Sequence, residues 1–258
     1  MSISVRYTIN MKYQKLSQTR IERINSLTRK GNSLNTISNK LNIKKTTVYY
    51  HFKKIRGRTV KPILIDVSDK ELLGELMGVF AGDGGFNKTK QYQYRVSFYF
   101  NKTEDKYVKE LKEIFYVLFQ KYPMQFQRQN KLILRYNSKA IIELINNYLT
   151  WNKQGKKSHS IRLITENHCE SFRIGFIRGN LDSDGYLSKE KITFATSSPY
   201  LANNINNFLN DLGINYHYYK YLDKRKNRVP MYHINIRKPK RNKFLDLIKP
   251  RELKNLKK

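Results

Sequence analysis

The chain has 258 residues and a formal net charge of +31, from 51 lysines and arginines against 20 aspartates and glutamates. A charge this positive favours a polyanionic partner, with nucleic acid first and an anionic membrane surface second. No apolar run approaches the roughly 18 residues of a membrane span, and the single cysteine, Cys169, excludes an intramolecular disulfide. We therefore expect an intracellular protein of a reducing compartment, the cytoplasm or nucleoid, with no membrane contact.

The N-terminal part of the chain is almost entirely basic. Residues 1–61 contain 15 lysines and arginines and one acid, Glu22. The spacing of apolar residues predicts a helix that ends near Gly31. Ser33 then has the position of a cap for a second, short helix over residues 34–41.

A third helix is predicted over residues 44–55, with Val48, Phe52 and Ile55 on its buried face. Helix, short turn and helix, with a basic and aromatic outer face, is the arrangement of a major-groove reader. Residues 16–56 accordingly resemble a helix-turn-helix of the resolvase or regulator type, and a solvated helical bundle is the alternative. The outward side chains, our candidate DNA contacts, are Lys45, Thr46, Tyr49, Tyr50 and Lys53.

A second region follows a linker predicted at residues 58–67. Ser68 with Glu71 three residues later is a capping-box pattern, and it predicts the start of a mainly apolar helix that ends at Asp83. The alternation of residues 91–98 then predicts a strand. Further helices and strands are predicted at 104–120, 124–129, 131–135 and 138–149.

The same order of elements recurs further along the chain. Asn167 and Glu170 repeat the capping pattern, and the helix that they start ends at Asp184, 101 residues after Asp83. We expect two repeats related by a pseudo-two-fold axis. The first covers residues 68–150, a linker covers 151–166, and the second repeat with a basic tail covers 167–258.

Each of the two repeat helices ends in two small residues four positions apart, followed by an aspartate. The small residues are Gly78 and Gly82 in the first helix and Gly179 and Ser183 in the second. A face of small residues lets two helix backbones approach closely. The two carboxylates would then repel each other and the helix dipoles, and a divalent cation with oxygen ligands would offset that repulsion. The alternative is that both aspartates are solvated helix-end residues.

Residues 76–84 and 177–185 resemble the LAGLIDADG motif of homing endonucleases, and the resemblance extends over residues 68–250. Residues 176–185 match closely, whereas Ala81 replaces the earlier acid of the first motif. The resemblance implies an α+β fold in which two pseudo-symmetric αββαββα repeats form a DNA-binding saddle. It also implies a monomer that needs no protein partner and cuts both strands of double-stranded DNA.

The resemblance further implies which residues act. Asp83 and Asp184 would bind Mg²⁺ with the backbone carbonyl groups of Gly82 and Ser183, and one aspartate would serve each strand. Asp182 is expected to be a helix-end or packing residue. Basic side chains near the scissile phosphates assist the reaction in this family, and the candidates are Lys139, Lys238 and Lys240.

The outer faces of the two predicted sheets carry side chains that suit base edges. Arginine pairs with guanine, and glutamine or asparagine with adenine, in the major groove. In the first repeat the candidates are Gln91, Gln93, Arg95, Gln125, Gln127, Lys131 and Arg135. In the second repeat they are Lys191, Thr193, His233, Asn235 and Arg237.

The sequence thus predicts a metal-dependent, site-specific DNA endonuclease with an added all-α helix-turn-helix domain over residues 1–57. Two alternatives stay open. One is a non-cleaving LAGLIDADG and helix-turn-helix regulator, which the presence of both acids disfavours although Ala81 shows that the first motif has drifted. The other is an RNA maturase that assists intron splicing, because a basic surface does not separate RNA from DNA, although the helix-turn-helix favours duplex DNA.

Overall fold

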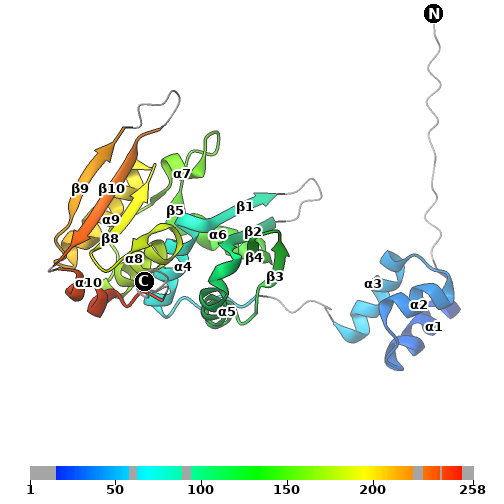
Figure 1. Cartoon of the computed structure of the whole chain (residues 1–258). Coiled ribbons are helices and arrows are strands. Elements are labelled where there is room, and N and C mark those ends of the chain that lie inside the picture. The colour runs from blue at the N-terminus through cyan, green and yellow to red at the C-terminus, as the bar shows by residue number, and fades with distance from the viewer. Residues whose placement is uncertain (1–15, 58–62, 89–93, 223–228, 239, 252–258) are drawn as a thin grey trace, which may run out of the picture. The chain divides into compact units, whose positions relative to one another are not determined.

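The computed structural model describes residues 16–57, 63–88, 94–222, 229–238 and 240–251. The chain forms two compact units, Met1–Pro62 and Ile63–Lys258, drawn in Figure 1. Each unit has a hydrophobic core of its own.

The described part of the first unit, residues 16–57, contains the helices α1 (Gln18–Arg29), α2 (Leu34–Leu41) and α3 (Lys45–Arg56). The predicted cap of α2 is confirmed, because the Thr36 N–H donates to Ser33 Oγ at 3.2 Å. Asn42 ends α2 in the left-handed region, with φ of 48°, and so starts the short turn into α3. Ile24, Ile37 and Val48 are fully buried, one from each helix.

The second unit is organised around two helices that pack side by side, α4 (Lys70–Asp83) and α8 (Glu170–Asp184). Figure 1 shows one antiparallel sheet on each side of this pair. In sheet 1 the strand order is β1-β2-β4-β3, and in sheet 2 it is β7-β8-β10-β9. Each sheet therefore has its third and fourth strands in the same exchanged order, which confirms the predicted internal repeat.

The strands of sheet 1 are β1 (Gly84–Lys88), β2 (Tyr94–Asn101), β3 (Met124–Arg128) and β4 (Lys131–Asn137). Those of sheet 2 are β7 (Tyr186–Leu187), β8 (Lys191–Thr196), β9 (His217–Tyr221) and β10 (Met231–Arg237). A separate pair is formed by β5 (Leu149–Thr150) and β6 (Arg162–Leu163), with α7 (Lys157–Ser160) between them.

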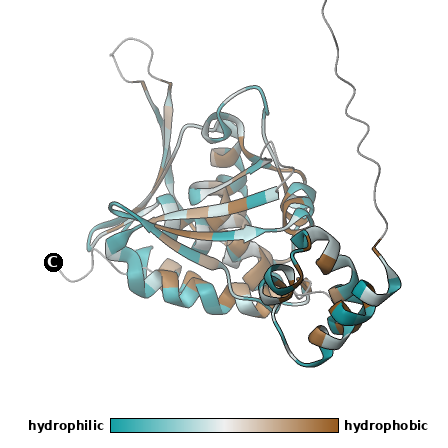
Figure 2. Ribbon diagram, turned by 90° about the vertical axis from the view of Figure 1, so that its right-hand side faces the viewer, coloured by the Kyte–Doolittle hydropathy of each residue, from teal (hydrophilic) through white to brown (hydrophobic). Residues whose placement is uncertain are grey.

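The other helices among the described residues of this unit are α5 (Asp105–Phe119), α6 (Lys139–Tyr148), α9 (Pro199–Asp211) and α10 (Arg241–Ile248), with the 3-10 turn η1 (Lys102–Glu104). Helix α5 packs on α4, α6 on β2, α9 on β8 and β10, and α10 on α8. Figure 2 shows that helices of the protein carry both hydrophobic and hydrophilic residues, as expected for helices with one face in a core.

The two central helices touch through a row of small residues. A Cβ atom added at Gly78 would overlap the Phe176 carbonyl oxygen and lie 2.7 Å from Asn180 N. One added at Gly179 would overlap the carbonyl oxygen of Glu75. The predicted close approach is thus confirmed, and Gly74 and Gly175 extend the row by one turn.

Three local predictions are wrong in detail. Asp69 rather than Ser68 caps α4, because its Oδ1 accepts from Leu72 N at 2.9 Å. The cap position of α8 is Cys169 rather than Asn167, and its side chain makes no capping bond. The strand predicted at 91–98 is β2, which ends three residues later, at Asn101.

Candidate active site

The two motif aspartates lie at helix tips that are in contact. A Cβ atom added at Gly82 would overlap Ser183 Oγ and lie 3.0 Å from both Cγ and Oδ2 of Asp184. Asp83, the next residue in α4, is partly buried, and Asp184 keeps part of its surface open to solvent. The small-residue row therefore places both acids at one end of the helix pair.

A lysine that the sequence did not single out closes the end of α4. The Lys157 ammonium group, on α7, donates to four carbonyl oxygens, those of Phe80 (2.7 Å), Ala81 (2.9 Å), Gly82 (2.9 Å) and Gly84 (2.6 Å). These carbonyl groups belong to the last turn of α4 and the residue after it, where the helix dipole favours a cation.

Lys157 and the two aspartates influence one another's ionisation. Burial lowers the pKa of Lys157 to about 8, while the charges of Asp184 and Asp83 act to raise it. The lysine is thus predominantly protonated at pH 7. Neighbouring protein atoms raise the pKa of the Asp184 carboxyl group by desolvation, and the charge of Lys157 opposes that shift.

The donors at this end of the helix pair fit a hard divalent cation, because the groups available are carboxylate and carbonyl oxygens. Asp83, Asp184 and the carbonyl group of Ser183 could hold such an ion. In the described part of the chain no group of three or more His, Cys, Asp or Glu side chains could hold a metal ion. Water or a phosphate oxygen of a bound nucleic acid would therefore complete the coordination.

A buried charge network supports the helix pair away from its tips. Glu75 on α4 is 0% exposed and receives two bonds from Arg251, at 2.6 and 3.0 Å. Arg178 on α8, 5% exposed, bonds to Glu75 at 3.2 Å, to Glu71 at 2.6 Å and to the Ile248 carbonyl oxygen at 2.6 Å. The network ties both motif helices to the segment that follows α10.

Asp182 belongs to this supporting network. It is 5% exposed, and its Oδ2 accepts from the backbone N–H of Arg251 at 3.0 Å. The prediction that Asp182 is a packing residue rather than a metal ligand agrees with this placement.

The predicted lysines lie against other groups. Lys139 pairs with Glu143 on its own helix at 2.8 Å, and Lys238 pairs with Glu190 at 3.0 Å. Lys240 lines a shallow pocket beside β9 and β10. The structure brings Lys157, and none of these three, onto the carbonyl groups at the end of α4. Sequence reasoning missed it because it lies in the inter-repeat linker, where no periodicity or motif marks one lysine among many.

The outer face of sheet 1 carries only part of the predicted set. Arg95, Lys131 and Arg135 share this face, and Arg135 Nε donates to Ser97 Oγ at 3.1 Å. Gln125 and Gln127 are opposite the core residues Leu134 and Leu132, so the expectation that they share the outer face is wrong. In this strand the residues that face outward are one position away from those that we expected to face outward. Gln91 and Gln93 lie outside the described residues. Side chains on this face that the prediction missed are Asn87, Tyr99, Phe126 and Arg128.

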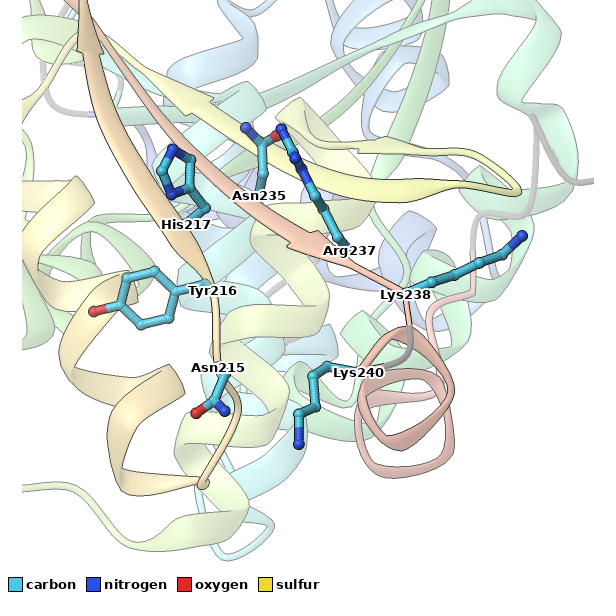
Figure 3. Close-up of a pocket in the computed structure, with 7 residues that line it drawn as sticks. All are labelled: Asn215, Tyr216, His217, Asn235, Arg237, Lys238 and Lys240. Atoms are coloured by element: carbon cyan, nitrogen blue, oxygen red, sulfur yellow. The ribbon is translucent and has the colours of Figure 1, made fainter.

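All five residues predicted in the second repeat lie on the outer face of sheet 2, as the strand register shows. Asn235 is nevertheless 4% exposed and accepts a bond from Thr193 Oγ1 at 2.6 Å. Figure 3 shows His217, Asn235 and Arg237 projecting from β9 and β10 into the pocket that they line.

The same face of sheet 2 is rich in rings. The His233 ring stacks on Tyr219 with centroids 5.0 Å apart and planes 10° from parallel. Burial and the charge of Lys191 lower the pKa of His233, so its ring is neutral at pH 7. The further ring-bearing residues on this face are Tyr186, His217 and Tyr221.

In the first unit, the α3 side chains proposed as contacts lie largely on the surface. Lys45, Thr46, Tyr50 and Lys53 are exposed, and Tyr49 is partly buried. The Lys54 ammonium group lies over the Tyr50 ring, 4.7 Å from its centroid.

The fold and these helix tips define a class of protein. Residues 171–249, within the second repeat, match the family described as LAGLIDADG-like domain. No curated protein matches the chain. Within the part that the structure describes, no helix is both long and apolar enough to cross a membrane.

Solved structures share the fold of the second unit. The structure of I-DmoI in complex with DNA and Mn aligns with a TM-score of 0.55 and 19% identity, over 72% of this chain and 100% of that one. The structure of mesophilic variants from the homing endonuclease I-DmoI aligns with a TM-score of 0.51 and 20% identity, over 69% of this chain and 90% of that one. The structure of I-DmoI in complex with DNA and Ca aligns with a TM-score of 0.50 and 18% identity, over 69% of this chain and 89% of that one. The second unit therefore has the mixed helix and sheet fold of LAGLIDADG homing endonucleases.

Proposed function

We propose that this protein is a site-specific endonuclease that depends on a divalent cation and cuts both strands of duplex DNA as a monomer. The observation that carries the proposal is the pair of aspartates at contacting helix tips, with a polar sheet face in each repeat. I-DmoI, whose fold this unit shares, is a homing endonuclease described in complex with DNA and Mn.

The residues at the helix tips would have distinct tasks. A divalent cation, with Mg²⁺ the expected ion, would lower the pKa of a water molecule and stabilise negative charge on the scissile phosphate. Asp83 and Asp184 would hold that ion, one acid for each strand. The small-residue row would keep the acids close, and the Glu75 network would keep the helices from sliding apart.

The two sheet faces would bind different halves of the target. Sheet 1 offers Arg95 and Arg135, which suit the acceptor pair of guanine. Sheet 2 offers rings such as Tyr219 and His233, which suit the thymine methyl group. The first unit would add phosphate and base contacts through α3, as a helix-turn-helix.

Substitution of the acids tests the proposal. The wild-type protein is incubated with Mg²⁺ or Mn²⁺ and a randomised duplex library, and the cut ends are sequenced. We expect a unique cut site in wild type. In Asp83→Asn and Asp184→Asn we expect cleavage to fall at least about a thousandfold, as when a group essential to the transition state is removed. DNA affinity should be equal or higher, because removing a carboxylate lessens repulsion of the phosphates. Undiminished cleavage by the double variant would disprove the assignment.

A second candidate is a DNA-binding regulator that does not cleave. The observation that favours it is Lys157, which already supplies positive charge where a divalent cation would act. Selection by affinity from the same library separates the two functions: a regulator would enrich one sequence and leave it uncut at every Mg²⁺ and Mn²⁺ concentration.

A further inference from the structure

The position of Lys157 is fixed by its loop. Residues 151–161 leave and return between the paired strands β5 and β6. Ser197 Oγ donates to the Ser158 carbonyl oxygen at 2.9 Å, and Ser198 Oγ donates to that of Ile161 at 2.8 Å. Both anchors come from the start of α9, so the second repeat holds the loop whose lysine closes the motif helix of the first repeat.

The surroundings of the Lys157 ammonium group resemble those of a bound cation. Four carbonyl oxygens lie within 2.9 Å of Nζ, and the Phe80 ring centroid is 5.1 Å away. An ammonium ion has three protons to donate, so at least one proton is shared between two oxygens. The Phe80 carbonyl oxygen also accepts from the backbone N–H of Gly84, whereas the carbonyl groups of Ala81 and Gly82, in the last turn, have no N–H partner within the helix.

The two helix ends have the same backbone cap but different side-chain donors. The Gly84 N–H donates to the Phe80 carbonyl oxygen at the end of α4, and the Gly185 N–H donates to that of Leu181, at 2.9 Å, at the end of α8. Among the described residues, no lysine or arginine side chain bonds to the carbonyl groups of residues 183–185. Ser183, the counterpart of Gly82, therefore keeps a carbonyl group that a divalent cation could use.

We propose that Lys157 is the resident cation of the α4 end, so that divalent cations bind on the α8 side of the two aspartates and Lys157 limits their affinity. The inference rests on the proposed function and deepens it. Lys157 is a positioning residue, because its ammonium group bonds to carbonyl oxygens at the helix end. The symmetric ligand pair expected from the sequence, Gly82 and Ser183, is replaced by Ser183 alone.

The physical reason is charge balance. The carboxylates of Asp83 and Asp184 attract a cation to the helix tips, and the Lys157 ammonium group offsets part of that attraction. A divalent cation arriving at the tips is attracted by the acids and repelled by the lysine. At about 6 Å in water, the repulsion between a divalent ion and a unit positive charge changes a binding constant by about tenfold.

Counting free Mn²⁺ by electron paramagnetic resonance tests the proposal on the full chain without DNA. We expect Lys157→Met to bind Mn²⁺ about tenfold more tightly than wild type. The matched control is Lys156→Met, which removes the same charge from the neighbouring exposed residue and should leave the Mn²⁺ affinity within about twofold. Asp184→Asn should weaken binding, which assigns the signal to the helix tips.

Unchanged or weaker Mn²⁺ binding by a folded Lys157→Met variant overturns the proposal. If that variant does not fold, the wild-type protein still decides. Lysine acetylation read by mass spectrometry should leave Lys157 protected, relative to Lys156, both without Mn²⁺ and at saturating Mn²⁺. Faster labelling of Lys157 at saturating Mn²⁺ would mean that the metal displaces it, and the proposal would be wrong.

These outcomes separate the inference from the proposed function. If the wild-type protein and Lys157→Met bind Mn²⁺ with the same affinity, the inference is wrong and the proposed function is unaffected. If only Lys157→Met binds Mn²⁺, the inference stands, and the wild-type protein would need a phosphate oxygen of bound DNA to hold the ion. If neither protein binds Mn²⁺ without DNA, the inference falls, and the cleavage assay alone decides the proposed function.

Discussion

At the scale of single residues, the unusual feature is a buried carboxylate that is paired with arginine side chains. Glu75 has no exposed surface, and its carboxylate receives bonds from two arginines, Arg178 and Arg251. A buried charge is tolerated only when its partners and hydrogen bonds replace water. The net attraction within the network therefore adds little to the stability of the fold. Removing one member would be costly, because it would leave a buried charge without a partner.

We expect Glu75→Gln to lower the free energy of unfolding of the second unit by about 3 to 5 kcal/mol, the usual cost of breaking a buried ion pair. Urea denaturation followed by circular dichroism measures it. The control is Glu143→Gln, which breaks the exposed Lys139–Glu143 pair and should cost at most about 0.5 kcal/mol. Similar decreases for the two variants would mean that the buried Glu75 network stabilises the fold no more than an exposed ion pair does.

At the scale of elements, the contact between α4 and α8 decides where the acids lie. At Gly78 and Gly179 the backbone of one helix lies directly against the backbone of the other. A change of side-chain rotamer therefore cannot make room for an added atom at either position. This interface sets the separation of the helix tips, and with it the distance between Asp83 and Asp184.

Gly78→Ala tests this interface. Alanine favours a helix over glycine by about 1 kcal/mol, so an isolated helix would gain stability. In the protein the new methyl group meets the backbone of Phe176 and Asn180, and overpacking of this kind costs about 1 to 3 kcal/mol or more. We expect a net decrease in the free energy of unfolding and weaker Mn²⁺ binding. Gly155→Ala, where the nearest atom is 3.6 Å away, should change neither quantity.

The helix tips could be predicted from the sequence because their signals are local. Small residues four apart and a following aspartate mark the same face of a helix wherever it packs. Lys157 and the Glu75 network could not be predicted, since the partners are distant in the chain: Arg251 follows Glu75 by 176 residues. Gln125 and Gln127 fell on the wrong face because a strand's phase shifts with one residue of turn length.

At the scale of the whole molecule, two units with separate cores share one basic chain. The 15 lysines and arginines of residues 1–61 account for a large part of the excess positive charge. Charge of this kind acts mainly on phosphates, which give affinity without sequence information. Target choice and cleavage would therefore rest on the second unit, and the first would add affinity.

Deletion of residues 1–62 tests this division of labour. The remaining chain keeps its entire core, so we expect a cooperative thermal transition within a few degrees of that of the full-length protein. The DNA dissociation constant should rise. The slope of log K against log salt should become shallower by about 0.9 for each phosphate that the first unit neutralises, and the cut site should be unchanged. A chain ending at Ile248 is the contrasting control, because it lacks Arg251 and should be less stable. If the deletion leaves both affinity and salt slope unchanged, the first unit does not bind DNA, and its basic face must serve another polyanion.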